Sequence, residues 1–320
     1  MNKITVSAPG KLMLLGEHAV LHGSPCIVTA VNQRMFVSVE TINEPFFILD
    51  APEVEIKNYK KPLSRLGKDK IEKGARFVEI AVLNFLSLYP QKSGFKITTK
   101  SQFSPLFGFG SSSASTVCTL KALSSLFKVN LDNKKLFDIA YKTVLDVQST
   151  GSGFDVAAAI FGGTIYFITG GKVIKPLKVK SLPLTVGYSG TKADTTEMIN
   201  LVSKKSQKFP RVIEEIYAQI AKLVDLSKKL IEKKDWQTLG ELMNFNQAYL
   251  SALGVSTKKL DGMISAARVS GAYGAKLSGA GGGDCMIAIG SNPKIKSAIQ
   301  KIGGRVINVK TNVEGVRVEK

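Results

Sequence analysis

The sequence predicts an α+β protein made of two domains that divide near residue 180. Strand-like and helical segments are mixed without the strict strand–helix–strand repetition of a parallel α/β sheet. The chain has 320 residues, which is enough for two modest domains. Most strand-like segments precede residue 180, and the longest amphipathic helices follow it. We therefore expect a first domain over residues 1–180 and a second over residues 181–320.

In the first domain, short apolar or alternating runs predict strands, and apolar residues spaced by three or four positions predict helices. The predicted strands cover residues 3–7, 12–15, 26–31, 35–41, 46–49, 95–99, 164–168 and 172–176. The predicted helices cover residues 71–89, 113–127, 133–147 and 154–161. Asp132 is suited to cap the third helix, and Gly162 and Gly163 end the fourth.

The second domain begins with a strand after Pro183 and continues with long helices whose apolar residues form one stripe. The chain then returns to strands around one shorter helix. The predicted helices cover residues 192–205, 210–233, 236–253, 257–270 and 293–302, and the predicted strands cover residues 184–188, 285–289, 305–309 and 315–319.

Composition limits the classes of protein to which the chain can belong. No apolar run approaches the roughly 20 residues of a membrane helix, and the N-terminus has no signal-peptide core. The three cysteines are odd in number and have no metal-like spacing, which suits a reducing compartment. We expect a cytoplasmic protein without a membrane partner.

The net charge of +19 favours a rival class, the nucleic-acid-binding proteins. The basic excess is spread evenly over both halves of the chain, and no RNP-like aromatic motif, zinc knuckle or recognition helix is present. We therefore expect no nucleic-acid partner. Steep salt dependence of RNA binding would support the rival class.

A glycine- and serine-rich loop predicts a phosphate site. Gly108 and Gly110 precede Ser111, Ser112 and Ser113, and a helical pattern follows. Glycines allow the backbone to approach a ligand, and a helix N-terminus offers unpaired N–H groups to an anion. The loop lacks the Gly-Lys-Ser/Thr of the P-loop, and a small-residue turn can also be a plain packing device. The pattern is typical of a nucleoside triphosphate site.

Two further segments carry unusual residues beside glycine turns. In the first, an apolar run separates Lys11 from Glu17 and His18; the lysine could also be a solvated surface charge. In the second, glycines 279 and 281–283 precede an apolar strand, a density that excludes an ordinary strand interior. A flexible hairpin would explain the second segment, and so would a loop that lies against a bulky ligand.

Together, the three segments resemble the three motifs of the GHMP small-molecule kinases, from about residue 4 to about residue 290. The resemblance implies a ribosomal-protein-like N-terminal domain for nucleotide binding and catalysis, a ferredoxin-like C-terminal domain, and an active site between them. The segment with Glu17 and His18 is most similar to the mevalonate kinases, whereas residues 151–155 and Asp284 are similar to phosphomevalonate kinases. We give Glu17 and His18 more weight, because phosphomevalonate kinases generally replace them.

The implied function is ATP- and Mg²⁺-dependent phosphorylation of mevalonate to 5-phosphomevalonate in isoprenoid biosynthesis. The alternative is a phosphomevalonate kinase that makes 5-diphosphomevalonate. That alternative needs additional cations for the substrate phosphate, for which Arg34, Arg76, Lys192 and Lys276 are candidates. Mevalonate or its phosphate and ATP are the expected small-molecule partners, and a homodimer is an open alternative to a monomer.

The resemblance also implies a role for individual residues. Asp155 would accept the proton of the attacking hydroxyl, and Lys11 would keep it ionised; a helix N-cap is the alternative role of Asp155. His18 would donate to the substrate carboxylate or hydroxyl. The remaining implied residues are Glu17 and Thr191 for the substrate, with Thr195 and Thr196 as the alternative to Thr191. For the nucleotide they are Gly108, Gly110, Ser111, Ser112, Ser113, Gly281 and Gly282, and for the magnesium ion Ser112.

One position departs from the family pattern. Mevalonate kinases usually have a metal-binding glutamate about eleven residues before the catalytic aspartate, and this chain has Val144 there. Either Asp146 takes over as the second magnesium ligand, or water and phosphate oxygens hold the metal instead, which magnesium tolerates.

Overall fold

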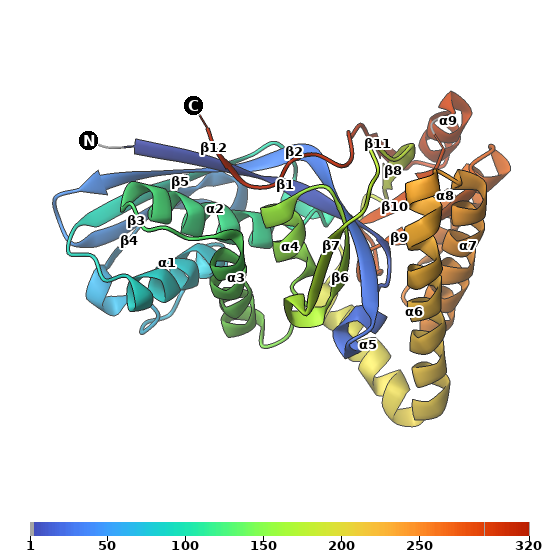
Figure 1. Cartoon of the computed structure of the whole chain (residues 1–320), viewed down its shortest axis with the longest axis horizontal. Helices are drawn as coiled ribbons and strands as arrows, with labels where there is room; N and C mark the ends of the chain where they lie inside the picture. Colours follow the sequence, from blue (N-terminus) through green and yellow to red (C-terminus); the bar gives the residue numbers. More distant parts are fainter. Residues whose placement is uncertain (1–2, 291, 320) are drawn as a thin grey trace.

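The computed structural model describes residues 3–290 and 292–319, and this part of the chain contains two antiparallel-rich sheets. The larger, eight-stranded sheet has the order β12-β1-β2-β5-β3-β4, with β6 and β7 added beside β2. The smaller, four-stranded sheet has the order β11-β8-β10-β9. Figure 1 shows α1 to α4 along one face of the larger sheet and α6 to α9 around the smaller one.

The element bounds follow the predicted pattern closely. The strands are β1 (Lys3–Leu15), β2 (Pro25–Ile42), β3 (Phe46–Ala51), β4 (Ile56–Pro62), β5 (Gly94–Ser101), β6 (Thr164–Ile168), β7 (Val173–Pro176), β8 (Leu184–Tyr188), β9 (Gly274–Ser278), β10 (Cys285–Ile289), β11 (Arg305–Ile307) and β12 (Arg317–Val318). The helices are α1 (Arg76–Leu88), α2 (Ser111–Leu126), α3 (Asn133–Gln148), α4 (Phe154–Phe161), α5 (Thr195–Lys208), α6 (Pro210–Lys233), α7 (Trp236–Leu253), α8 (Lys258–Val269) and α9 (Pro293–Lys301).

The two predicted N-terminal strands are one continuous strand, β1. Its pairing with β2 shifts register between Pro9 and Gly10 and again between Met13 and Leu15. These irregularities let the strand absorb a proline and a glycine without ending. The result matters for the site, because β1 passes directly beside the loop before α2: the Lys11 amide donates to the Phe109 carbonyl at 3.0 Å.

Capping explains where several helices begin and end. The Asp132 side chain accepts from the Lys135 amide, which confirms the predicted cap of α3. Helix α4 ends before Gly162, as predicted. Helix α5 begins at Thr195 rather than 192, because Asp194 accepts from the Thr196 and Glu197 amides and so fixes the first turn.

Two strands were not predicted. β4 is rich in lysine and gives no clear alternation, and β9 lies within the segment that the glycines marked as a loop. β9 is buried at every residue and forms the edge of the smaller sheet. Side chains of α7 cover that edge: Asn244 accepts from the Ala275 amide and Gln247 from the Leu277 amide.

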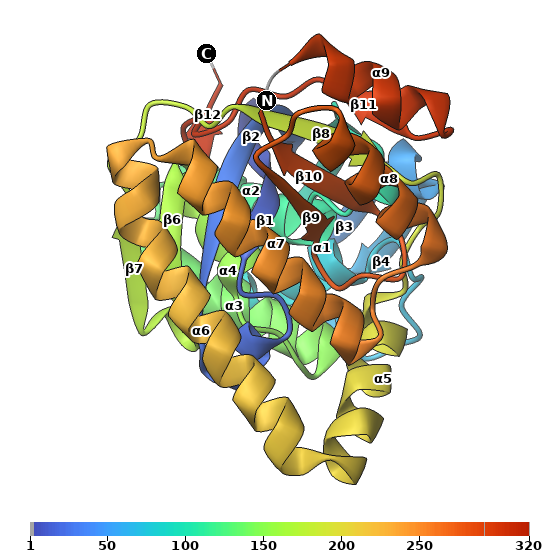
Figure 2. The ribbon, with the colours of Figure 1, turned by 90° about the vertical axis from the view of Figure 1, so that its right-hand side faces the viewer.

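The end of the chain returns to the larger sheet. β12 pairs antiparallel with β1, and the buried Arg34 guanidinium donates to the carbonyls of Glu314 and Gly315. Figure 2 shows α6 and α7 crossing in front of the sheets, where one hydrophobic core joins residues of both sheets, including Val37 and Ile287. Among the described residues, no helix is both long and apolar enough to cross a membrane.

Candidate active site

The three sequence motifs meet around one cavity of about 250 Å³. β1 and the turn after it, the loop before α2, the first turn of α4, the start of α5 and the glycine loop all contribute to its wall. We call residues 105–110 the phosphate loop, residues 189–194 the α5 loop and residues 279–283 the glycine loop. The motifs are far apart in sequence, so their convergence on one cavity is a property of the fold.

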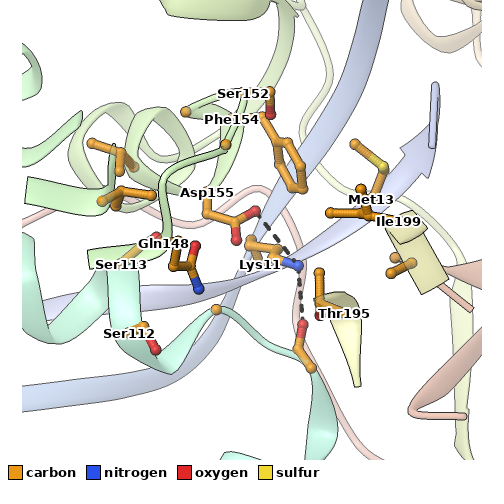
Figure 3. A pocket seen from close by; sticks show the side chains of 18 of the residues that line it. Lys11, Met13, Ser112, Ser113, Gln148, Ser152, Phe154, Asp155, Thr195 and Ile199 are labelled. Atoms are coloured by element: carbon orange, nitrogen blue, oxygen red, sulfur yellow. Dashed lines mark hydrogen bonds and ion pairs between the residues drawn. The ribbon is translucent and has the colours of Figure 1, made fainter. Parts of the chain in front are cut away.

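Lys11 occupies the centre of this site (Figure 3). Its Nζ donates to the Gly108 carbonyl at 3.0 Å and lies 3.6 Å from Asp155 Oδ1. The same Nζ is 5.1 Å from the ring centroid of Phe154, within reach of a cation–π interaction. The ammonium group is therefore held between a carboxylate and the phosphate loop, and the interpretation of Lys11 as a solvated surface lysine is wrong.

Asp155 belongs to the first turn of α4 but does not cap it. Gly153 is the N-cap residue, with φ of +90°, so the capping alternative for Asp155 is wrong. Its side chain is 31% exposed, yet Oδ1 is enclosed and accepts no hydrogen bond from the described residues. Burial raises the pKa of Asp155, and Lys11 opposes that shift. The rest of the carboxylate is accessible from the cavity, so a hydroxyl group there would approach Asp155 through the exposed part of the group.

The phosphate loop requires glycine at two positions. Gly108 and Gly110 have φ of +69° and +78°, and a Cβ at Gly110 would lie 3.1 Å from Lys11 Cε. Gly110 is the N-cap of α2 and has no capping side chain, so the first N–H groups of the helix remain available to an anion. Ser111, Ser112 and Ser113 line the cavity at this helix end.

Glu17 and His18 also line the cavity, and both are buried. The Glu17 carboxylate accepts from the Lys276 ammonium of β9, and its second oxygen, Oε2, is enclosed without a partner. His18 Nε2 lies 2.8 Å from the Ala280 carbonyl, so Nε2 donates, and burial lowers the His18 pKa. The neutral ring leaves Nδ1 as an acceptor. The expected donation to substrate thus requires protonation of His18 or release of Ala280.

Four other residues with implied roles do not line the cavity. Within the glycine loop, Gly281 packs against Val255 and Gly282 against Met198, while Gly279 and Ala280 line the cavity. The Thr191 carbonyl accepts from the Asp284 amide, and Thr195 and Thr196 line the cavity nearby. Asp146 accepts from Lys142 and from Asn84, away from the cavity.

Sequence reasoning did not identify three apolar residues of the site. Met13, Phe154 and Ile199 form an apolar part of the wall near Lys11 (Figure 3). A signal for Met13 was present, because residues two apart on a strand share a face and Lys11 had been identified. Ile199 lies one helical turn after Thr195 and could have been found in the same way. The buried pairing of Lys276 with Glu17 left no signal in the sequence.

Comparisons with known proteins identify the family of the chain. Residues 76–163 match the model described as "GHMP kinases N terminal domain", residues 227–307 match "GHMP kinases C terminal", and residues 2–41 match "Galactokinase galactose-binding signature". The chain is 34% identical to the mevalonate kinase of Pyrococcus abyssi over 99% of this chain and 98% of that protein.

Solved structures give the same result for the fold. The mevalonate kinase of Methanococcus jannaschii superposes with a TM-score of 0.83 at 25% identity, covering 98% of this chain and 99% of that one. The phosphomevalonate kinase of Streptococcus pneumoniae, in complex with phosphomevalonate and AMPPNP, reaches a TM-score of 0.80 at 18% identity, covering 97% and 100%, a likeness that shows the fold alone. The predicted two-domain α+β fold is confirmed, and the chain belongs to the GHMP kinase family, in which it is similar over its full length to the mevalonate kinases.

Proposed function

We propose that this small-molecule kinase phosphorylates mevalonate to 5-phosphomevalonate, with ATP as the phosphoryl donor and magnesium as the metal, in isoprenoid biosynthesis. The observation that carries the proposal is the placement of Lys11, whose ammonium contacts both Asp155 and the phosphate loop. A phosphoryl donor on that loop and a hydroxyl beside Asp155 would thus be brought together at one charged group.

Phosphoryl transfer depends mainly on positioning and on stabilising charge. In our proposal, the exposed part of the Asp155 carboxylate accepts the proton of the attacking hydroxyl, while its enclosed Oδ1 faces the Lys11 ammonium. Lys11 favours the ionised carboxylate and stabilises negative charge on the transferred group. The glycines and serines 108–113, with the N-terminus of α2, hold the phosphates of ATP.

The Ser112 hydroxyl and the exposed part of the Asp155 carboxylate line the cavity and are the oxygen donors that a magnesium ion would meet there. Such an ion neutralises phosphate charge when bound. Asp146 hydrogen bonds to Lys142 and Asn84 and lies outside the cavity wall. We therefore propose Ser112 as a protein ligand, with water and phosphate oxygens in place of a second carboxylate from α3.

The positions of the cations favour mevalonate over 5-phosphomevalonate as the acceptor. Of the four cations considered for the phosphomevalonate alternative, only Lys192 lines the cavity, and its ammonium donates to the Pro105 carbonyl. Arg34 binds the C-terminal segment, and Lys276 pairs with Glu17.

A coupled ADP-release assay tests the proposal. The purified protein is supplied with ATP and Mg²⁺ and is offered mevalonate or 5-phosphomevalonate in parallel reactions. We expect turnover with mevalonate and no more than background with 5-phosphomevalonate. Turnover with only the phosphorylated acceptor would refute the proposed substrate while leaving the kinase assignment intact.

A further inference from the structure

Asp284 directly follows the glycine loop and has a backbone conformation that favours glycine. Its φ is +55°, in the left-handed region that costs energy for residues with a Cβ, although aspartate tolerates it better than most. Its side chain lines the cavity but has none of the roles described above. Its contacts explain why a carboxylate is useful at this position.

Asp284 holds the α5 loop through three hydrogen bonds. Its Oδ1 accepts from the Ala193 amide at 2.9 Å, its own amide donates to the Thr191 carbonyl at 2.8 Å, and its carbonyl accepts from the Ser189 amide at 2.9 Å. The two main-chain bonds would survive a change of side chain. The bond to Ala193 would not, and it is the one nearest to α5.

The same carboxylate packs on the phosphate loop. A Cβ built at Gly108 would lie 2.5 Å from Asp284 Oδ2, so the carboxylate occupies the space in which a side chain at Gly108 would stand. Two neighbouring contacts also reach the phosphate loop. From the α5 loop, the Lys192 ammonium donates to the Pro105 carbonyl at 2.6 Å, and from the start of β10, Cys285 Sγ donates to the Phe107 carbonyl at 3.3 Å. Asp284 thus lies where the phosphate loop, the α5 loop and the glycine loop meet.

This contact fixes the start of α5. Ala193 precedes Asp194, whose side chain caps the helix by accepting from the Thr196 and Glu197 amides. The next residues, Thr195 and Thr196, line the cavity, as does Ile199 one turn later. In Figure 3, Thr195 and Ile199 lie on the side of Lys11 occupied by Met13. This side is opposite Ser112, which we assign to the nucleotide and its magnesium ion.

We propose that Asp284 is a positioning residue, which holds the first turns of α5 against the phosphate loop and so shapes the acceptor side of the cavity. The proposal rests on the function proposed above, because it assigns the α5 side to mevalonate. Asp284 acts through Ala193 and does not take part in the chemical step. Its hydrogen-bond acceptor is therefore required, and its negative charge is not.

Two substitutions separate the acceptor from the charge. Asp284→Asn keeps an oxygen that can accept from Ala193, and asparagine tolerates the left-handed backbone. Asp284→Gly removes the acceptor and relieves the backbone. Lys234→Gly is a matched control, because Lys234 has φ of +59° at the end of α6 and does not line the cavity.

Steady-state kinetics with mevalonate and ATP measure the consequence. We expect Asp284→Gly to raise the KM for mevalonate about tenfold or more, with kcat changed less than about threefold. Asp284→Asn and Lys234→Gly are expected to match the unsubstituted protein. Amide hydrogen exchange gives a readout that needs no turnover: residues 193–199 are expected to exchange faster in Asp284→Gly alone.

Three results would overturn the proposal. The first is an Asp284→Gly variant whose KM and exchange both remain unchanged. The second is an Asp284→Asn variant that is as impaired as Asp284→Gly, which would assign the role to the charge, at a metal or a phosphate. The third is a rise in the KM for ATP alone. If the glycine variant does not fold, Asp284→Asn still tests the proposal, because a raised KM for mevalonate in that variant would refute it.

The two proposals fail in different ways. If the unsubstituted protein does not phosphorylate mevalonate, the proposed function fails, and hydrogen exchange still tests whether Asp284 holds α5. If the protein phosphorylates mevalonate and the Asp284→Gly variant keeps its KM, the positioning role alone fails.

Discussion

At the level of single side chains, the site depends on Asp155, whose enclosed Oδ1 lies 3.6 Å from the Lys11 ammonium. We expect Asp155→Asn to lower kcat by about 10²–10⁴-fold, because the amide cannot accept a proton from the hydroxyl. Nucleotide binding should remain close to that of the unsubstituted protein, since the phosphate loop is unchanged. Coupled ADP release measures kcat, and titration calorimetry measures ATP binding.

A suitable control for this substitution is Asp138→Asn, which changes an exposed carboxylate of α3. It should leave both measurements unchanged. Full activity in Asp155→Asn would mean that another group accepts the proton.

The opposing influences on Asp155 also predict a pH effect. Burial raises its pKa above the usual 3.8, and Lys11 lowers it. The carboxylate must be ionised to accept a proton, so kcat/KM should fall as the pH drops through this pKa. In Lys11→Met the opposing charge is lost, so the acidic limb of the profile should move to higher pH as well as to lower rates.

Lys11→Arg keeps the positive charge and is the control for this pH profile. Its acidic limb should stay near that of the unsubstituted protein, although the rate can change because arginine has a different shape. An acidic limb that does not move in Lys11→Met would show that the ammonium does not influence the ionisation of Asp155.

Asp155 and Lys11 could be identified from sequence because each belongs to a short motif of unusual residues. The sequence could not reveal the neutral state of His18 or the absence of Asp146 from the cavity wall. Both depend on the surroundings of the side chain, namely burial, which lowers the pKa of His18, and the Lys142 and Asn84 side chains, which hold Asp146.

At the level of secondary-structure elements, the close contact between α7 and β9 supports the strand that carries Lys276. A Cβ at Gly240 of α7 would lie 2.4 Å from the Tyr273 carbonyl carbon, so Gly240→Ala would push the helix from the strand. We expect this substitution to lower the free energy of unfolding by about 1–3 kcal/mol. Chemical denaturation at equilibrium measures the change.

Gly262 of α8 offers the matched substitution. A Cβ there would have Ile302 Cδ1 as its nearest neighbour, at 3.9 Å, which is an ordinary contact. Gly262→Ala should therefore raise the free energy of unfolding by about 0.5–1 kcal/mol, because alanine is a better helix former. If Gly240→Ala and Gly262→Ala changed the free energy of unfolding equally, the close contact between α7 and β9 would not be what makes Gly240 necessary.

Periodicity predicted most helices and strands, but their ends depended on other factors. α5 begins three residues later than expected, because Asp194 caps it. β9 was missed because its glycine-rich surroundings resemble a loop, and its edge amides are paired with helix side chains rather than with another strand.

Across the whole molecule, one buried ion pair connects the turn after β1 with β9 of the smaller sheet. Both side chains of the Glu17–Lys276 pair are fully buried. Glu17→Gln would leave the Lys276 ammonium without its counter-charge, and burial already lowers the pKa of that lysine. We expect a loss of about 3–5 kcal/mol in the free energy of unfolding, measured by chemical denaturation.

The double substitution Glu17→Gln with Lys276→Met should recover part of this loss, because it leaves no buried charge unpaired. Asp138→Asn breaks an exposed pair with Lys134 and should change stability by less than about 1 kcal/mol. Similar losses for the buried and exposed pairs would contradict the proposed role of the buried one.

Periodicity and motifs were sufficient to predict the α+β class, and the resemblance of the motifs to the GHMP kinases was sufficient to predict the family and the closeness of Lys11 to Asp155. These features depend on residue types and on periods within short segments of chain. Tertiary structure alone decided that Lys276 neutralises Glu17, that Asp284 holds the α5 loop, and that Met13 and Ile199 share one wall. Glu17 and Lys276 are 259 positions apart, and contacts at such separations leave no periodic pattern, because they arise only when the chain folds.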